Sequence, residues 1–265
     1  MKKTIISCVL FLTAVTAFSQ TTMKTAAEAK LSASDLAVKI ADRILATTTY
    51  EFKNTKTGKT YKSVKDLPLD MNVKVACKYN NWHYTNGVTH IALMELADKT
   101  GAKKYDDYVF KNMNFVFNEG NLDFFKKQYD QAMKDEGWYG VRKLSWHMIF
   151  RGKRLDDNGP MGASLIDLQM KHPNNSFLNY INETAEHLNY GEPRLADGTI
   201  ARIWPHENTI WADDAFMAIS FLARMAKMTG DMNYINDAAN QVIKYHKYLW
   251  CPEKRILYHC YHTDT

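Results

Sequence analysis

The amino-acid sequence predicts an all-α protein that is built from helical hairpins. Apolar residues recur at helical spacing through most of the chain, whereas strand-like alternation is weak throughout. The segment "LMELADKTGAKKY" (93–105) aligns with "LARMAKMTGDMNY" (222–234), and another helix pair is expected between them over 161–170 and 177–188, so we predict three helix–turn–helix units. The chain has 265 residues, 46% of them hydrophobic, which is enough to bury one sizeable core. Because a hairpin cannot bury its apolar face alone, we expect the hairpins to stack into a toroid or a solenoid.

The N-terminal residues 1–20 have the pattern of a secretory signal peptide. Lys2 and Lys3 precede an apolar run over 5–18, after which small and polar residues offer a cleavage region. The run is too short and too weakly flanked for a stable transmembrane helix, and no later stretch is apolar enough to span a bilayer. We therefore expect an exported protein, periplasmic or secreted, with one domain over residues 21–265.

The remaining elements follow from the spacing of apolar residues and from turn signals. Residues 53–68 lose this spacing and are rich in lysine and threonine, so we expect a surface connection there. Gly101 is expected to end a helix, because glycine readily adopts the left-handed conformation at a helix C-terminus. The helical segments are expected at residues 36–45, 87–99, 104–117, 161–170 and 177–188, in a helix that contains Phe216, and in a last helix that follows the Thr229-Gly230 turn.

Charge and cysteine content exclude several classes of protein. The formal net charge is +5, to which Lys2 and Lys3 contribute, and no basic stripe with interleaved aromatic residues is present. We therefore expect no nucleic-acid partner. The cysteines beyond the leader are Cys77, Cys251 and Cys260, whose odd number and irregular spacing do not suit a disulfide framework or a zinc site. Since no metal motif, P-loop or dinucleotide fingerprint occurs, we predict neither a metal nor a cofactor.

Two acidic segments lie at the starts of predicted helices in successive hairpins. They are "RLDDNGPMGASL", with Asp156 and Asp157, and "IWPHENTIWADDAFM", with Asp213 and Asp214. Carboxylates in a first helical turn are stabilised by exposed backbone N–H groups, so helix capping explains any one of these acids equally well.

The second segment is distinguished by Trp204, His206 and Trp211, which crowd the same short stretch. Aromatic faces beside carboxylates are a common way to hold a sugar ring, and burial beside them raises the pKa of a carboxyl group. A general acid that works near neutral pH needs such a pKa. The alternatives, tryptophans in the core and a structural histidine, stay open at this point.

Five motifs together resemble glycoside hydrolase family 105 and its relative family 88. They are "WHYTNG" (82–87), "LDDNG" (155–159), "PRLADG" (193–198), "WPHENTIWADDAFMA" (204–218) and "LYHCYH" (257–262). The resemblance implies an (α/α)6-barrel, a toroid of six hairpins. With about seven of its twelve helices recognisable by periodicity, we expect the barrel to be incomplete. The chain is then either a fragment of a longer protein, which we favour because the acidic and aromatic segments are intact, or a degenerate remnant. In both cases a partner for the substrate carboxylate is expected to be lost with the rest.

The resemblance also implies roles for individual residues. Asp213 matches the catalytic acid, and Asp157 matches the second acidic position, with Asp156 as the adjacent candidate. Asp214 is expected to cap or orient. The remaining sugar-binding positions implied are Trp82, His206, Trp211 and His259.

The chemistry implied is hydration of a vinyl ether. The substrate is a pectin-derived rhamnogalacturonan oligosaccharide that ends in a 4,5-unsaturated uronic acid, and Asp213 protonates C4 while water adds at C5. Two other functions fit the residues: another sugar reaction on the same fold, and a non-catalytic helical module that binds carbohydrate or protein. The leaving sugar and the oligomeric state are not determined by the sequence.

Overall fold

The computed structural model describes residues 32–151 and 154–263 of the chain. The predicted signal peptide, residues 1–20, lies outside the described residues and stays a prediction. Contacts divide the chain into two units, residues 1–46 and 47–265. The described part of the first unit is helix α2 (Ala33–Thr47), as the apolar spacing predicted.

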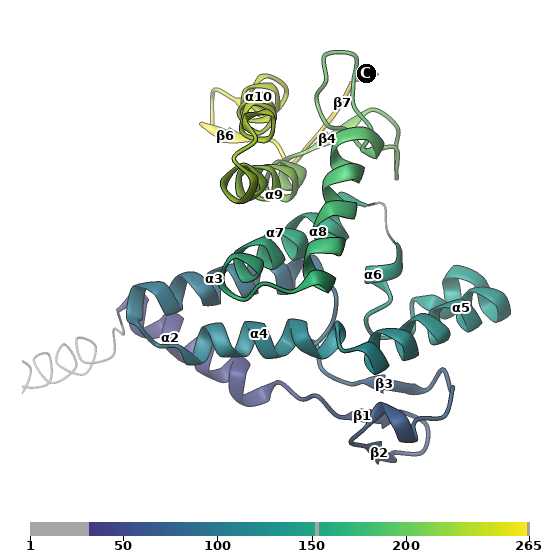
Figure 1. Cartoon of the computed structure of the whole chain (residues 1–265). Helices are drawn as coiled ribbons and strands as arrows, with labels where there is room; N and C mark the ends of the chain where they lie inside the picture. The colour runs from purple at the N-terminus through teal and green to yellow at the C-terminus, as the bar shows by residue number, and fades with distance from the viewer. Residues whose placement is uncertain (1–31, 152–153, 264–265) are drawn as a thin grey trace, which may run out of the picture. The chain divides into compact units, whose positions relative to one another are not determined.

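The second unit consists mainly of helices arranged as hairpins (Figure 1). Its helices are α3 (Tyr84–Thr100), α4 (Lys104–Val116), α5 (Glu119–Val141), α6 (Met148–Arg151), α7 (Leu155–Lys171), α8 (Asn175–Glu186), α9 (Ala212–Thr229) and α10 (Met232–Leu249). The described residues thus form nine α-helices, where the sequence predicted about seven. The two additional helices are α5 and α6. Gly137, with φ 61° and ψ −149°, interrupts α5, and α6 is a single turn, so neither shows a sustained apolar period.

The repeated sequence segment forms equivalent hairpins, α3–α4 and α9–α10. Gly101 (φ 70°) and Gly230 (φ 74°) end the first helix of each hairpin in the left-handed conformation. Their backbone N–H groups donate to the carbonyls of Ala97 and Ala226, which stand at matching positions of the alignment. The helix–turn–helix repeat predicted from the sequence is confirmed.

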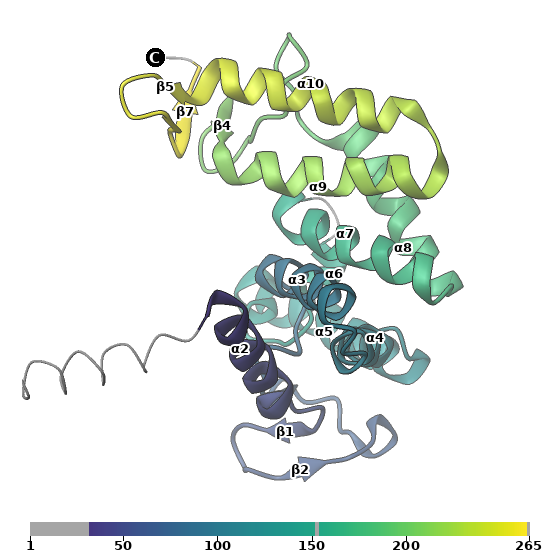
Figure 2. The ribbon, with the colours of Figure 1, turned by 90° about the vertical axis from the view of Figure 1, so that its left-hand side faces the viewer.

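Helices α3, α7 and α9 lie beside one another with their N-termini at the same end (Figure 2). A Cβ atom on Gly87, near the start of α3, would lie 2.4 Å from the backbone of Pro160 in α7. A Cβ on Gly159 would lie 2.3 Å from the carbonyl oxygen of Met217 in α9. Only glycine permits such backbone contact, so these two residues align the three helix starts. First-turn residues of three helices therefore gather at one end.

Residues 52–75 differ from the predicted surface connection. They contain the antiparallel strands β1 (Phe52–Asn54), β2 (Thr60–Tyr61) and β3 (Val73–Val75), in the order β2-β1-β3. Phe52 is buried, and its ring centroid lies 5.8 Å from that of Phe124 in α5. Residues 53–68 are otherwise mostly exposed, as predicted. The strands were missed because strands of two or three residues are too short to show alternation.

Two further strand pairs follow later in the chain. Strand β4 (Thr209–Trp211), which leads directly into α9, pairs with β7 (Cys260–His262), and β5 (Trp250–Cys251) pairs with β6 (Ile256–Leu257). No helix of the described residues is long and apolar enough to cross a bilayer. The three described cysteines are free thiols.

Candidate active site

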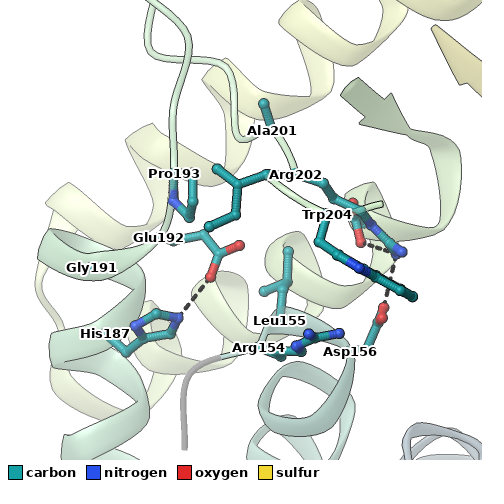
Figure 3. Close-up of a pocket in the computed structure, with 12 residues that line it drawn as sticks. Arg154, Leu155, Asp156, His187, Gly191, Glu192, Pro193, Ala201, Arg202 and Trp204 are labelled. Atoms are coloured by element: carbon teal, nitrogen blue, oxygen red, sulfur yellow. Dashed lines mark hydrogen bonds and ion pairs between the residues drawn. The ribbon is translucent and has the colours of Figure 1, made fainter. Parts of the chain in front are cut away.

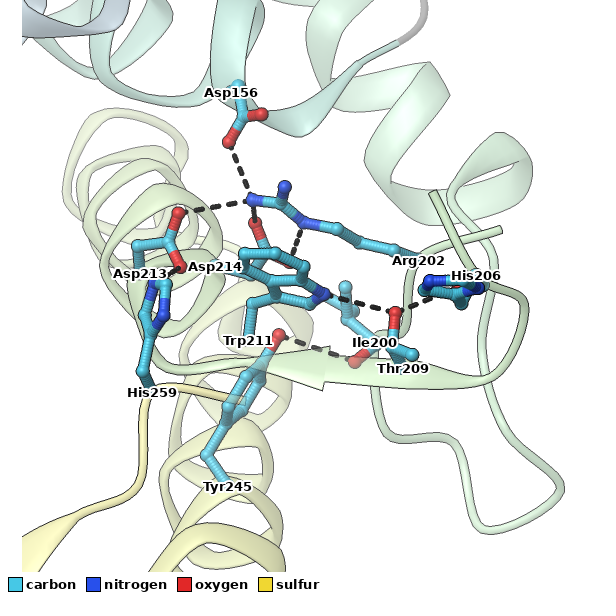
Figure 4. Close-up of polar contacts among 10 residues, drawn as sticks. All are labelled: Asp156, Ile200, Arg202, His206, Thr209, Trp211, Asp213, Asp214, Tyr245 and His259. Atoms are coloured by element: carbon cyan, nitrogen blue, oxygen red, sulfur yellow. Dashed lines mark hydrogen bonds and ion pairs between the residues drawn. The ribbon is translucent and has the colours of Figure 1, made fainter. Parts of the chain in front are cut away.

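Arg202 joins three carboxylates at the shared N-terminal end of α7 and α9 (Figure 4). Its Nη2 donates to Oδ1 of Asp156 at 2.9 Å, to Oδ2 of Asp213 at 3.1 Å and to Oδ1 of Asp214 at 2.7 Å. Its Nε donates to the second oxygen of Asp214, also at 2.7 Å. We refer to Arg202, Asp156, Asp213 and Asp214 as the acid cluster. One guanidinium charge is shared by three carboxyl groups, so the cluster has an excess of acid.

Asp214 holds Arg202 in place. Its side chain is 2% exposed, and a buried carboxylate is tolerated only when it is paired. Burial raises the pKa of Asp214 to about 6, although the hydrogen bonds from Arg202 act in the opposite direction. The bidentate pairing fixes the plane of the guanidinium and hence the directions of its remaining N–H donors.

Local backbone structure explains why Arg202 reaches this position. Residues 194–209 fold back on themselves through isolated bridges of Arg194 with Ile200 and of Arg202 with Thr209. The Arg202 N–H donates to the Thr209 carbonyl at 2.7 Å, so Arg202 lies beside the strand that leads into α9. Two residues after Thr209, Trp211 forms the N-cap of α9.

Asp213 is the accessible acid of the pair at the start of α9. Its side chain is 40% exposed, whereas that of Asp214 is 2% exposed. Its Oδ1 is buried, accepts no hydrogen bond from any described residue, and lies 3.7 Å from Nε2 of His259. Buried acceptors without a partner are uncommon in native proteins and need an explanation, such as a catalytic role.

The predicted residues Trp211 and His259 both lie at Asp213. Pairing of β4 with β7 brings Trp211 opposite Cys260, and the Ala212 N–H donates to the His259 carbonyl at 2.8 Å. The Arg202 guanidinium lies 4.5 Å from the Trp211 ring centroid, within cation–π distance. The His259 imidazole is 74% exposed and meets the Trp211 ring edge-on at 5.1 Å. A ligand at Asp213 would therefore contact both rings.

Asp156 and Asp157 face different surroundings. Asp156 belongs to the acid cluster, whereas the buried Asp157 forms an ion pair with Arg151. Burial raises the pKa of Asp157 to about 6, against the effect of Arg151. The sequence placed Asp157 at the second acidic position. The structure instead brings Asp156 to Asp213, since adjacent residues in a helical turn point in different directions.

Trp82 does not line the site as the sequence predicted. Its side chain is fully buried, its Nε1 donates to the Asp157 carbonyl at 2.9 Å, and its ring meets Tyr180 edge-on at 4.7 Å. This burial leaves the indole no surface for a sugar. Trp82 is instead a core residue that ties the segment before α3 to the first turn of α7.

His206 is exposed, and among the described residues it forms no hydrogen bond or ion pair with the acid cluster. Its carbonyl accepts a hydrogen bond from the Thr209 hydroxyl at 2.9 Å, and its ring lies 5.5 Å from that of His262. In Figure 4 the His206 ring lies on the opposite side of Trp211 from Asp213. The structure thus separates His206 from the other predicted site residues.

The spacing of the three carboxylates also suits a cation. Oxygens of Asp156, Asp213 and Asp214 lie within 4.8 Å of one another. The Arg202 guanidinium bonds to all three, however, and so already occupies the position between them. In this arrangement the positive charge at the centre of the site comes from a side chain.

Arg202 was not among the site residues predicted from the sequence. One physical signal pointed to it: two adjacent aspartates at one helix start, Asp213 and Asp214, cannot both be buried without a cation. The nearest arginine in the preceding segment is Arg202. That it also reaches Asp156 in another helix depends on tertiary packing.

Comparisons with known proteins show the family and the fold of the chain. The family model described as Glycosyl Hydrolase Family 88 matches residues 54–265. No curated protein matches the chain significantly. Among solved structures, the chain is similar to a possible member of glycoside hydrolase family 105 from Klebsiella pneumoniae, with a TM-score of 0.54, 14% identity and 88% of this chain covered.

Two other solved structures have a similar fold. A family 105 glycoside hydrolase from C. acetobutylicum gives a TM-score of 0.51 with 20% identity over 76% of this chain. The family 76 α-1,6-mannanase of a Salegentibacter species gives 0.51 with 13% identity over 88%. The chain spans about half the length of these structures, between 47% and 57%. The likeness is one of fold, consistent with part of an (α/α) barrel.

Proposed function

Because the chain belongs to glycosyl hydrolase family 88, we propose that its acid cluster removes a 4,5-unsaturated uronic acid from pectin-derived oligosaccharides of the rhamnogalacturonan type. The observation that carries this proposal is Asp213: a partly exposed carboxyl group at a helix start, one oxygen of which accepts no hydrogen bond from the described residues, beside Trp211 and His259.

In the proposed reaction Asp213 donates its proton to C4 of the unsaturated sugar. Water adds at C5, its proton returns to the carboxylate, and the resulting C5 hemiketal collapses with release of the remaining oligosaccharide. Arg202 contributes by holding Oδ2 of Asp213 at 3.1 Å and so fixing the orientation of the carboxyl group. The reaction consumes one water molecule and needs no redox partner.

The position of Arg202 favours this reaction over hydrolysis of a saturated glycoside by a retaining mechanism with Asp156 and Asp213. A retaining enzyme places two carboxyl groups about 5–5.5 Å apart across the anomeric carbon. Oxygens of Asp156 and Asp213 come within 4.8 Å, but the same Nη2 atom of Arg202 bonds to both. The guanidinium thus fills the space that an anomeric carbon would need. A single acid acting on an alkene requires no such space.

The test is loss of the ultraviolet absorbance of the C4–C5 double bond. Incubation of the chain with unsaturated disaccharides made by rhamnogalacturonan and glucuronan lyases should consume the absorbance of the first. Asp213→Asn should lower the rate by a factor of about 10² to 10⁴, as expected for a lost general acid. Asp130→Asn, an exposed aspartate paired with Lys126 in α5, is the matched control and should leave the rate unchanged.

Four results would count against the proposal. Persistent absorbance with both disaccharides would reject an unsaturated uronyl hydrolase. Release of sugar from a saturated glycoside without any loss of absorbance would favour a different glycosidase reaction. Full activity in Asp213→Asn would show that another residue is the acid. If wild type and Asp213→Asn both bound the ligand fully and neither turned it over, a non-catalytic binding module would explain the cluster better.

A further inference from the structure

A cavity of about 300 Å³ lies against the acid cluster (Figure 3). Asp156, Arg202 and Asp214 form one wall, and the other side is lined by His187 and Glu192. The volume is at the lower end of small-molecule sites, which measure about 300–1,000 Å³. Because Asp156 and Asp213 bind the same atom of Arg202, the cavity is next to the proposed acid.

Three carboxylates are among the residues that line this cavity. Besides Asp156 and Asp214, Glu192 lines it, with Oε2 bonded to Nε2 of His187 at 2.7 Å. The Arg202 guanidinium is already shared by the three aspartates of the acid cluster. A neutral sugar could donate its hydroxyl groups to these oxygens, but an acidic sugar also needs an uncommitted cation.

Arg154 supplies that cation. It lines the cavity, is exposed, and forms no ion pair with any carboxylate in the part of the chain that the structure describes. Its guanidinium lies 5.1 Å from the centroid of the Trp204 ring, which also lines the cavity and is 62% exposed. The aromatic ring restrains the guanidinium without neutralising it. An arginine can bind a carboxylate with two parallel hydrogen bonds.

We propose that this cavity binds a carboxylate-bearing sugar, with Arg154 pairing with the carboxylate and Trp204 packing against the ring. The inference rests on the proposed function, of which it specifies the recognition step: selection of an acidic over a neutral sugar. It also places the partner of the substrate carboxylate within this chain, whereas the sequence led us to expect that partner elsewhere.

The experiment measures binding, so that it does not depend on turnover. Isothermal titration calorimetry compares the full chain with two saturated probes: galacturonyl-rhamnose and its carboxyl methyl ester. The ester has nearly the same shape but no charge. Wild type should bind the acid roughly tenfold more tightly than the ester, as expected for a charge-assisted pair at a partly exposed site.

Arg154→Gln should weaken binding of the acid roughly tenfold, leave binding of the ester unchanged, and so abolish the discrimination. Trp204→Ala should weaken both probes by similar factors, because stacking does not depend on the charge of the carboxyl group. Arg142→Gln is the matched control: Arg142 is also exposed but does not line the cavity. It should behave as wild type, and circular dichroism should show that all three variants are folded.

The inference is wrong if wild type does not prefer the acid, or if Arg154→Gln keeps the preference. The absorbance assay separates this failure from failure of the proposed function. Turnover of the unsaturated disaccharide with an unchanged preference in Arg154→Gln would remove only the role of Arg154. Charge-dependent binding through Arg154 without any turnover would support the binding site and reject the reaction.

Discussion

The two ends of the helices α3, α7 and α9 both carry ion pairs, but the pairs differ in burial and in charge balance. At the C-terminal end, Lys171 binds Asp98 and Asp106 at 2.9 and 3.0 Å, and Arg224 binds Asp167 at 2.7 Å. Each of these side chains is at least 20% exposed. At the N-terminal end, one arginine serves three aspartates, of which Asp214 is 2% exposed.

The difference separates structural ion pairs from functional ones. Exposed pairs such as those at the C-terminal end contribute little, because solvent screens them and each partner stays hydrated when the other is removed. The acid cluster lowers the stability of the folded state, since burial of unbalanced acids opposes folding. A chain keeps such an arrangement where charge is used, so this contrast supports the function proposed for the acid cluster at the N-terminal end. Three predictions test this contrast.

The largest effect is expected from removing the central cation. Arg202→Met leaves the buried Asp214 without a partner and should lower the free energy of unfolding by about 3–5 kcal/mol. Arg224→Met, the equivalent change at the other end, leaves Asp167 with access to water and should cost about 1 kcal/mol. Urea unfolding followed by circular dichroism measures both.

A double variant distinguishes lost pairing from lost packing. In Arg202→Met with Asp214→Leu no buried charge remains unpaired, so most of the stability should return while the hydration activity stays low. If Arg202→Met and Arg224→Met cost the same, or if the double variant stays as unstable as Arg202→Met, the contrast between the two ends is wrong.

A second prediction concerns pH. The pKa of Asp214 is about 6 in the folded chain and near 3.8 when unfolded, because burial disfavours the charged form. The folded state therefore binds the proton more tightly, so the stabilisation is complete below about pH 4 and is lost as the pH rises through 6. The free energy of unfolding should fall by roughly 2 kcal/mol from this group between pH 4 and 7.

Asp214→Asn should remove that part of the pH dependence, as measured by urea unfolding at a series of pH values. In the variant the free energy of unfolding should still fall with rising pH, though less steeply, because the pKa of Asp157 is also raised to about 6. Equal slopes in wild type and Asp214→Asn would show that Asp214 is not the titrating group, and a slope of opposite sign would contradict burial as its cause.

Patterns that depend on local spacing could be predicted from the sequence. The repeated Thr-Gly turn gave correct ends for α3 and α9, because a left-handed C-cap depends on one residue. Pairs of acids at Asp156 and Asp213 were recognised because first-turn carboxylates follow from the helix pattern. The family motifs then indicated the glycoside hydrolase family and the barrel type.

Contacts between distant segments could not be predicted in the same way. Whether Asp156 or Asp157 faces Asp213 depends on the rotation of α7, which the backbone contact of Gly159 with Met217 helps to fix. Trp82 was assigned to the sugar pocket because an aromatic residue in a motif looks the same whether it is buried or exposed. Its burial against Tyr180 required the packing of α8.

The smallest effect is expected at the C-terminal end, from Lys171→Gln. Lys171 is 30% exposed and its partner Asp98 is 67% exposed, so the variant should lower the free energy of unfolding by only about 0.5–1 kcal/mol. Because Lys171 also binds Asp106 in α4, the loss should lie near the upper limit of that range. Urea unfolding at low and high salt measures this loss. High salt should shrink the difference between variant and wild type, since ions screen exposed charges.

Hydration activity and the preference for an acidic sugar should be unchanged, because the altered charge lies at the opposite end of α7 from Asp156. A loss of either property in folded Lys171→Gln would mean that the two ends of the helices are coupled, and the acid cluster could then no longer be treated as a site whose charge balance is set locally by Arg202.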